Sequence, residues 1–430
     1  FFRLSSQTEN LMKKIIFSVL AVGIVGALVW AGVFYWKNLR GIGPVINNSP
    51  IDIGTIVPED QKTRSTTTSA SLHQNTTGLP LKLPPGFSIT IFAKSLPGAR
   101  VIYPLYDWFI VSLTSQGKII GLRDTDGDGV ADERTVLAEG LNHPHGLTAF
   151  CEPMAKEFDC KLYVAEENRI VAYSLGSFPK KLTAPQKIID LPAGGNHTTR
   201  TIGFGPDGRL YVAIGSTCNV CNESDPRRAA IYSLNKDGSD FKLFAKGLRN
   251  SVFFAWHPET KKMWATEMGR DLIGDDIPPE EINIVEEGKS YGWPTCYGKN
   301  IRDTDFDRNT SIRNPCMEPF EMPSTVDIQA HSAPLGLAFI PDGGWPEEYH
   351  NDLLVAYHGS WNRSVPTGYK VVRMKFDARG NYQGTEDFIT GWLVSKSEAL
   401  GRPVDILAMP GGVLYISDDK AGVMYKVTAP

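Results

Sequence analysis

The feature that most constrains the fold of this chain is one phrase that recurs six times. Each copy has a turn marked by Gly or Pro, a short apolar strand, a second turn, and an apolar strand such as KLYVA, RLYVA or VLYIS. The copies begin at residues 101, 141, 201, 248, 333 and 402. The strands are too short and too closely bounded by Gly and Pro to be helices. Three or four short strands per repeat are typical of one propeller blade, so the phrase predicts an all-β, six-bladed β-propeller. A β-sandwich, the alternative fold, would not explain six copies.

The composition agrees with a fold that is rich in turns. Gly and Pro account for 41 and 29 of the 430 residues, which disfavours a helical bundle or a coiled coil. A single core usually stops growing at ~250–300 residues, but repeats allow residues 80–430 to form one closed ring. The net charge of −4 argues against a nucleic-acid partner, because such proteins carry a basic surplus.

The N-terminal region contains an apolar run, residues 15–36, of 22 residues without a charge. At ~1.5 Å per residue, a helix of this length spans about 33 Å, which is enough for the core of a bilayer. The run is longer than the apolar region of a cleaved signal peptide, which is the alternative interpretation. It is therefore predicted to be a transmembrane anchor, preceded by a segment, residues 1–14, in which Met12 looks like the natural start.

The anchor is followed by a stretch that is predicted to be a flexible linker, residues 37–79. Within it, residues 63–78 contain nine Ser and Thr residues and no apolar periodicity. Such a segment can bury little apolar surface, so it should not fold on its own.

The six cysteines form three pairs that are local in the sequence: Cys151/Cys160, Cys218/Cys221 and Cys296/Cys316. An even number of cysteines in local pairs is typical of disulfides in an oxidising compartment. A zinc site is the alternative, but the C-x-x-C of Cys218 and Cys221 has no second C-x-x-C partner. We therefore predict three disulfides and place the propeller on the extracytoplasmic, periplasmic side of the membrane.

Polar residues gather where the repeats begin. In a propeller, the loops that enter the inner strands meet at one mouth of the central channel, so residues distant in the sequence converge there. These loops carry His and Arg at equivalent positions, in residues 142–145 (NHPH), 196–200 (NHTTR), 248–250 (LRN), 330–333 (AHSA) and 401–403 (GRP). Neutral His suits proton abstraction near pH 7, and Arg suits a polyanionic ligand or a developing oxyanion.

An ordered set of phrases between residues 80 and 428 resembles one known family. The phrases are residues 196–208 (NHTTRTIGFGPDG), 247–250 (GLRN), 291–294 (YGWP), 331–339 (HSAPLGLAF), 358–363 (HGSWNR) and 417–422 (SDDKAG). Together they resemble the glucose/sorbosone dehydrogenase family, nearer to its sorbosone dehydrogenase-like branch. Members of that family are six-bladed propellers that carry pyrroloquinoline quinone (PQQ).

The resemblance implies roles for residues of the mouth loops. His197 occupies the position of the catalytic base, which takes a proton from the substrate hydroxyl while hydride passes to the quinone. Arg249 would stabilise charge on the reduced quinone. The implied cofactor contacts are Asn250, Arg402, His331, and Arg363 or its neighbour Asn362, and His145 is implied to lie on the substrate side.

The resemblance also implies a calcium ion that bridges PQQ and two backbone carbonyls, which by position are those of Gly269 and Arg270. Calcium prefers such oxygen ligands. This sequence departs from the family pattern in two places: the connection over residues 271–330 is long, and Val404 stands where some members have a second arginine.

A separate acidic loop matches the first half of a calcium-binding loop. Asp124, Asp126 and Asp128 take positions 1, 3 and 5, with Gly129 at position 6 and Asp132 further along. Position 12 is Thr135 rather than the bidentate Glu, so this is not a complete EF-hand loop. The loop is predicted to hold a second, structural calcium ion, and a solvated turn is the alternative.

Three functions follow from these observations. The first is a membrane-tethered, PQQ-dependent dehydrogenase for a sugar or aldose, which passes electrons to a membrane quinone or a cytochrome. The second is a metal-dependent, lactonase-type hydrolase, which requires acidic metal ligands in the channel. The third is a non-catalytic interaction propeller, which would not need His197, Arg249 and Arg402 at matching positions.

Overall fold

The computed structural model describes residues 6–35, 46, 51, 75–153, 158–176, 178–377 and 379–430. One long helix, α1 (Ser6–Phe34), precedes the β-structure. Its segment Met12–Phe34 is long and apolar enough to cross a membrane. The predicted anchor extends to Trp36, which lies outside the described residues.

Within the described residues, the strands form six main sheets and one two-stranded sheet. Each main sheet is one blade, so the predicted six-bladed β-propeller is confirmed. The first three blades contain β2 (Ala99–Leu105) to β5 (Glu133–Glu139), β6 (Leu147–Pro153) to β9 (Gln186–Asp190), and β10 (Ile202–Phe204) to β13 (Lys242–Lys246). The last three contain β14 (Phe254–Trp256) to β16 (Glu280–Val285) with β20 (Val326–Ile328), β21 (Pro334–Phe339) to β24 (Tyr382–Ile389), and β25 (Pro403–Met409) to β27 (Val423–Thr428) with β1 (Ser88–Ala93).

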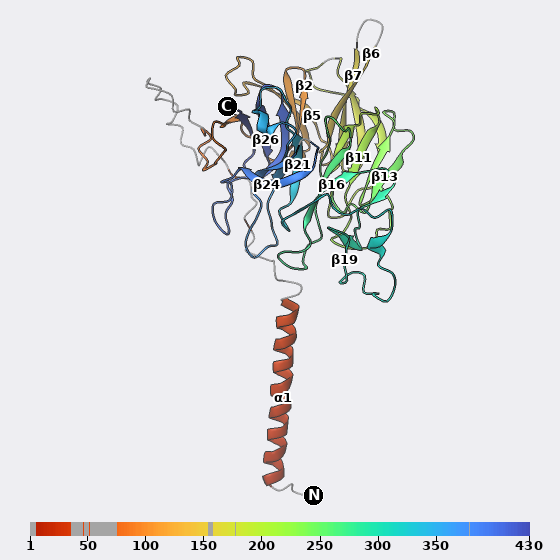
Figure 1. Cartoon of the computed structure of the whole chain (residues 1–430), viewed down its shortest axis with the longest axis vertical. Coiled ribbons are helices and arrows are strands. Elements are labelled where there is room, and N and C mark those ends of the chain that lie inside the picture. Colours follow the sequence, from red (N-terminus) through yellow and green to blue (C-terminus); the bar gives the residue numbers. More distant parts are fainter. Residues whose placement is uncertain are drawn as a thin grey trace.

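The ring closes through β1, which pairs antiparallel with β27 and so completes the last blade with the first strand of the propeller. The first strands of neighbouring blades lie side by side where the ring closes, because β2 contacts both β6 and β25. In Figure 1 the last blade, in blue, lies beside β2 of the first blade, in orange.

Apolar strands create the core between the blades. All five residues of β11 (Leu210–Ile214) and of β22 (Leu353–Tyr357) are buried, as expected of strands that are covered on both faces. Phe92 of the last blade packs against Phe109 and Tyr415, and this contact joins the last blade to the first. Burial of one such large side chain stabilises the fold by about 1.5–3 kcal/mol.

All three predicted disulfides form. Cys151 and Cys160 lie opposite each other on β6 and β7 (Phe158–Glu166). Cys218–Cys221 closes a short loop after β11, and Cys296–Cys316 bridges the long insertion of the fourth blade, which also contains β18 (Cys296–Tyr297) and β19 (Ile301–Arg302).

The predicted linker, residues 37–79, falls largely outside the described residues. Its described parts contact the propeller: Ile46 is 2% exposed within the core of the last two blades, and the Ile51 amide donates to the Lys420 carbonyl at 3.0 Å. Asn75 also donates side-chain hydrogen bonds to the carbonyls of Leu79 and Leu81.

Candidate active site

A cavity of about 250 Å³ opens at the end of the propeller where the first strands begin. Two sets of loops meet there, because antiparallel pairing brings the end of each second strand beside the start of the first. The loops before the first strands contribute His197, Arg249, His331 and Arg402. The loops after β15 (Met263–Glu267) and β22 contribute residues 268, 269 and 271, and residues 358, 359, 361 and 362.

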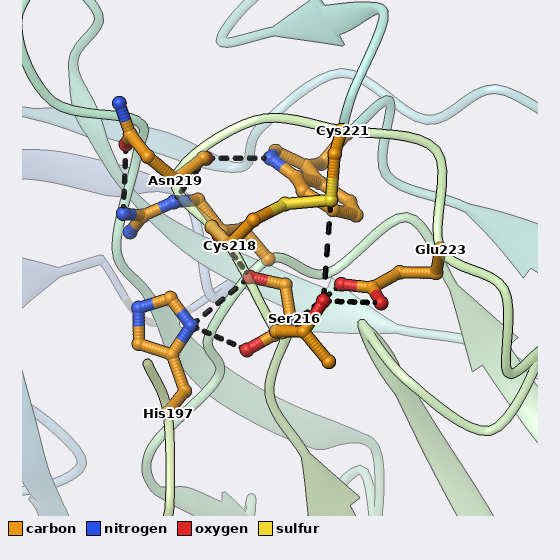
Figure 2. The surroundings of a disulfide bond; sticks show 9 residues. His197, Ser216, Cys218, Asn219, Cys221 and Glu223 are labelled. Atoms are coloured by element: carbon orange, nitrogen blue, oxygen red, sulfur yellow. Dashed lines mark hydrogen bonds between the residues drawn. A yellow bond between two sulfur atoms is a disulfide. The ribbon is translucent and has the colours of Figure 1, made fainter. Parts of the chain in front are cut away.

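His197 presents a neutral imidazole to this cavity. Its Nδ1 lies 2.9 Å from the Ser216 carbonyl oxygen and 3.0 Å from Ser216 Oγ. A carbonyl can only accept, so Nδ1 carries the proton and Nε2 is the unprotonated nitrogen. Figure 2 shows that this second nitrogen points away from Ser216. Burial, and then the charge of Arg249, lowers the pKa of His197 to about 3.

Local structure fixes the His197 loop. Arg200 is fully buried and donates from Nη1 to the His197 carbonyl at 3.0 Å. A Cβ at Gly215 would lie 2.6 Å from the His197 Cβ and 2.7 Å from the Asn250 Oδ1. The absence of a side chain at Gly215 therefore allows the loops that carry His197 and Asn250 to approach.

Arg249 is held by four hydrogen bonds and is 4% exposed. Nε donates to the Asn219 carbonyl at 2.9 Å and Nη1 to the Met268 carbonyl at 3.3 Å. Nη2 donates to Asn219 Oδ1 at 3.0 Å and to Asp271 Oδ2 at 2.9 Å. A guanidinium has five N–H groups, so these bonds leave one Nη1–H for a ligand in the cavity.

Asp271 organises the same wall of the cavity. Its Oδ1 accepts a hydrogen bond of 2.7 Å from Asn362 Nδ2, and its Oδ2 pairs with Arg249. The single side-chain oxygen of Asn362, Oδ1, is buried and has no partner among the described residues. His331 lies nearby, with Nδ1 4.0 Å from Asp271 Oδ1 and Nε2 2.7 Å from the Gly274 carbonyl.

A second cluster of charged and polar side chains surrounds Arg402. Its Nε and Nη2 donate to the carbonyls of His358 and Gly359 at 2.9 and 2.8 Å. His358 Nε2 lies 2.9 Å from Asp419 Oδ1, and Arg100 Nη1 pairs with Asp419 Oδ2 at 3.0 Å. The attraction of His358 and Arg100 holds the pKa of Asp419 below its usual range, although burial opposes this shift.

Not all predicted contacts line the cavity. Asn250 is 6% exposed, its amide nitrogen lies 3.4 Å from Met268 Sδ, and it lies outside the cavity lining. Arg363 donates to the Asp275 carbonyl and to Asp276, so Asn362 rather than Arg363 lines the cavity. His145 is fully buried, with Nδ1 3.3 Å from Thr201 Oγ1 and its ring against Phe253. The structure thus separates His145 from the cavity lining.

The predicted calcium ligands lie on the loop after β15. The Gly269 amide donates to Glu280 Oε2 at 2.7 Å, and the Arg270 side chain pairs with Asp303 at 2.6 Å. Within the described parts of the chain, no hydrogen bond goes to the carbonyl oxygens of Gly269 or Arg270. The two carbonyls and the unpartnered Asn362 Oδ1 are oxygen ligands that suit a hard cation. The guanidinium groups of Arg249 and Arg402 suit a polyanionic cofactor.

The acidic loop lies elsewhere, between β4 (Lys118–Arg123) and β5. Carboxylate oxygens of Asp124, Asp126 and Asp128 come within 4.8 Å of one another. Asp132 instead accepts hydrogen bonds from Thr125. Calcium binding at this loop stays a prediction.

Sequence reasoning missed five residues of the wall as site residues: Met268, Asp271, Glu280, His358 and Trp361. It also missed Asn219, which contacts Arg249 from outside the cavity lining. His358 and Trp361 stand inside the phrase HGSWNR, and Asp271 follows the predicted calcium loop directly. These residues could have been predicted from the propeller topology. In each blade, the loop after the second strand lies at the same mouth of the channel as the loop before the first strand.

Known proteins share this architecture. An uncharacterized protein of Borreliella burgdorferi is 32% identical over 357 residues, which cover 81% of this chain and 90% of that protein. A PQQ-dependent pyranose dehydrogenase of Coprinopsis cinerea is 31% identical over 119 residues, 24% of this chain and 16% of that protein. The holo form of a Coprinopsis cinerea pyranose dehydrogenase PQQ domain superposes with a TM-score of 0.67 at 19% identity, and covers 81% of this chain and 97% of its own.

A Trichoderma reesei carbohydrate-active enzyme of family AA12, solved with iodide and with calcium, superposes with a TM-score of 0.68 at 19% identity. The iodide structure covers 85% of this chain and 100% of its own. Structures this distant in sequence support the propeller fold alone, and the sequence similarity to a PQQ-dependent pyranose dehydrogenase agrees with the predicted family resemblance. The family model described as TrAA12-like matches residues 81–430, so this chain belongs to the TrAA12-like family.

Proposed function

We propose that this protein is a PQQ-dependent dehydrogenase that oxidises a hydroxyl or hydrated aldehyde of a sugar. The observation that carries the proposal is His197, which lines the same cavity as Arg249. Its Nδ1–H is committed to Ser216, and its Nε2, which points away from Ser216, has no hydrogen bond to the described residues. The names of the Coprinopsis and Trichoderma proteins support the cofactor and the carbohydrate substrate.

The residues of the cavity fit the two parts of such a reaction. When bound, PQQ supplies the quinone that accepts hydride from the substrate carbon. His197 Nε2 accepts the proton of the substrate hydroxyl, because the imidazole is neutral at all pH values well above 3. The free Nη1–H of Arg249 supplies positive charge where negative charge develops.

Other residues would hold the cofactor and its cation. Arg402 offers a positive charge to the cavity, and Asn362 offers an oxygen that has no partner among the described residues. The carbonyls of Gly269 and Arg270 would hold Ca²⁺, a role supported by their lack of hydrogen bonds among the described residues and by the calcium form of the Trichoderma protein. Helix α1 would anchor the propeller to a membrane, on the extracytoplasmic side, where a membrane quinone or a cytochrome accepts the electrons.

The hydrolase alternative has less support. A lactonase-type site requires a cluster of acidic metal ligands in the channel. Among the described residues, the clusters of at least three His, Cys, Asp or Glu side chains lie at Cys218 and at Asp124, not on the cavity wall. The two carboxylates of the wall are committed, Asp271 to Arg249 and Asn362, and Glu280 to the Gly269 amide.

The test is reconstitution of the full chain in detergent with PQQ and Ca²⁺. We expect PQQ to bind in a calcium-dependent manner, followed by reduction of an artificial dye with at least one member of an aldose panel. Calcium-dependent binding without any sugar oxidation would reject the proposed substrate class, and an absence of PQQ binding would reject the quinoprotein assignment.

A further inference from the structure

A four-residue ring contacts Arg249 directly and is connected to His197 through Ser216. It is formed by residues 218–221 (CNVC), follows β11, and is closed by the Cys218–Cys221 disulfide. Figure 2 shows this ring with Asn219 at one edge and Ser216 and His197 below it. The ring itself is not part of the cavity lining, so it can act on the chemistry only through its neighbours.

Two oxygens of Asn219 accept hydrogen bonds from the guanidinium of Arg249. Its carbonyl accepts from Nε at 2.9 Å, and its Oδ1 accepts from Nη2 at 3.0 Å. The same side chain is tied to Asp271, because Oδ1 accepts from the Asp271 amide at 2.7 Å and Nδ2 donates to the Asp271 carbonyl at 2.9 Å. Asn219 thus holds the Arg249 guanidinium and the Asp271 backbone in fixed positions relative to each other.

The ring is connected to His197 through one residue, Ser216. Ser216 Oγ donates to the Cys218 carbonyl at 2.7 Å, and the same hydroxyl and its carbonyl lie beside His197 Nδ1. On the far side, the Thr217 amide and hydroxyl donate to the two oxygens of Glu223 at 2.6 and 2.7 Å. Both ends of the ring are therefore held, and Asn219 projects from its middle.

We propose that Asn219, held in place by the Cys218–Cys221 ring, is the positioning residue that fixes the Arg249 guanidinium at the cavity wall. The role rests on the proposed function of Arg249. The physical reason is that a charge stabilises a transition state best when its position is fixed before the reaction, since no reorganisation is then required. The disulfide removes freedom from the loop, so that Asn219 meets Arg249 in one conformation.

The experiment compares five forms of the full chain in detergent: wild type, Asn219→Ala, Asn219→Asp, Cys218→Ser with Cys221→Ser, and Cys151→Ser with Cys160→Ser. Asn219→Asp keeps both oxygens that face Arg249. The Cys151–Cys160 pair is the matched control, because it joins β6 to β7 outside the cavity lining. The β6–β7 hairpin extends from the side of the propeller that lies opposite β19 (Figure 1).

The first readout needs no activity. Phenylglyoxal modifies accessible guanidinium groups, and mass spectrometry resolves the modification of Arg249. We expect Arg249 to be protected in wild type, in Asn219→Asp and in the Cys151/Cys160 variant, and to be modified at least about fivefold faster in Asn219→Ala and in the Cys218/Cys221 variant. Equal protection in wild type and Asn219→Ala, or equal exposure in both cysteine variants, overturns the proposal.

The second readout is steady-state kinetics of the PQQ- and Ca²⁺-loaded forms. Asn219→Ala should lower kcat about tenfold or more and leave KM for the sugar within about twofold, because Arg249 acts in the transition state. Asn219→Asp should recover most of this loss. A loss that Asn219→Asp does not recover, or that the Cys151/Cys160 variant shares, contradicts positioning. Where wild type oxidises no sugar, the proposed function fails, while the labelling of Arg249 still decides the role of Asn219.

Discussion

Arg249 Nη2 donates a hydrogen bond of 2.9 Å to Asp271 Oδ2, and this ion pair joins the loop before β14 to the loop after β15. The two residues are 22 positions apart in the sequence, yet both line the cavity. The guanidinium of Arg249 places a positive charge beside His197, and the carboxylate of Asp271 compensates that charge.

Asp271→Asn should therefore affect both catalysis and stability. An amide offers one oxygen where the carboxylate offers two, so either Arg249 or Asn362 loses its acceptor. We expect kcat of the loaded enzyme to fall about tenfold to a hundredfold and the free energy of unfolding to fall by about 1–3 kcal/mol.

The matched control for this variant is Asp352→Asn. Asp352 pairs with Arg373 at 2.6 Å, and both side chains are buried outside the cavity lining. This control should lose stability to a similar extent and keep its kcat. Equal losses of kcat in both variants would show that Asp271 acts only through global stability.

The pH dependence of kcat/KM tests the state of His197. Burial and the charges of Arg249, Arg200 and Arg228 hold the pKa of His197 at about 3, against an ordinary value of 6.5. The base thus stays neutral as pH falls, so kcat/KM for an aldose should stay flat between pH 7 and pH 5. Arg249→Met removes a positive charge and should move the acid limb to higher pH. An acid limb near pH 6.5 in wild type would contradict this environment.

The buried carboxyl of Asp418 should make stability depend on pH. Asp418 is fully buried, and burial raises its pKa to about 7 from an ordinary value of 3.8. The folded state therefore retains a proton that the unfolded state releases, so its contribution to stability is present below about pH 4 and is lost as pH rises through 7.

Asp418→Asn should remove this contribution to the slope, which is at most about 1.4 kcal/mol per pH unit for one proton. Oδ1 can keep its bonds from the amides of Arg402 and Ala421, and the new amide can donate to Tyr425. Denaturant unfolding of the apo-protein between pH 4 and pH 8 measures the slope. Asp377→Asn, in an exposed turn, should leave the slope between pH 5 and pH 7 unchanged, and an unchanged slope in Asp418→Asn would show that Asp418 is ionised in the fold.

Calcium should act at two separable places. Removal of calcium with a chelator should abolish PQQ loading, because the proposed ligands near the cofactor are the carbonyls of Gly269 and Arg270. The variant Asp124→Asn with Asp126→Asn should keep calcium-dependent PQQ loading and lose the increase in Tm that calcium gives the apo-protein. Loss of PQQ loading in this variant would contradict the separation of the two sites.

The repeated phrase predicted the blades well, because each blade is built mostly from strands that are neighbours in the sequence. The outer strand of the fourth blade was not predictable in this way. β20 pairs with β16 only after an insertion of 40 residues that contains β18, β19 and a disulfide, and no local pattern indicates such a distant partner.

The same contrast applies to the site. The position of His197, Arg249 and Arg402 in the repeat predicted their convergence, since the backbone of each loop enters the same mouth. His145 holds an equivalent position, but its side chain packs against Phe253 and Thr201 instead of facing the cavity. Repeat position thus predicts where a loop lies and not where its side chains point. Asp271 and Asn219 were missed because their roles depend on contacts between loops of different blades.

An anaerobic single-turnover experiment on the full chain loaded with PQQ and Ca²⁺ tests most directly whether His197 is the base in PQQ-dependent sugar oxidation. We expect an aldose to reduce the bound quinone, seen as a change in its absorbance, and His197→Ala to slow this reduction about 10²–10⁴-fold while PQQ remains bound. No change in the quinone spectrum with any sugar, or equal rates in wild type and His197→Ala, would contradict this expectation.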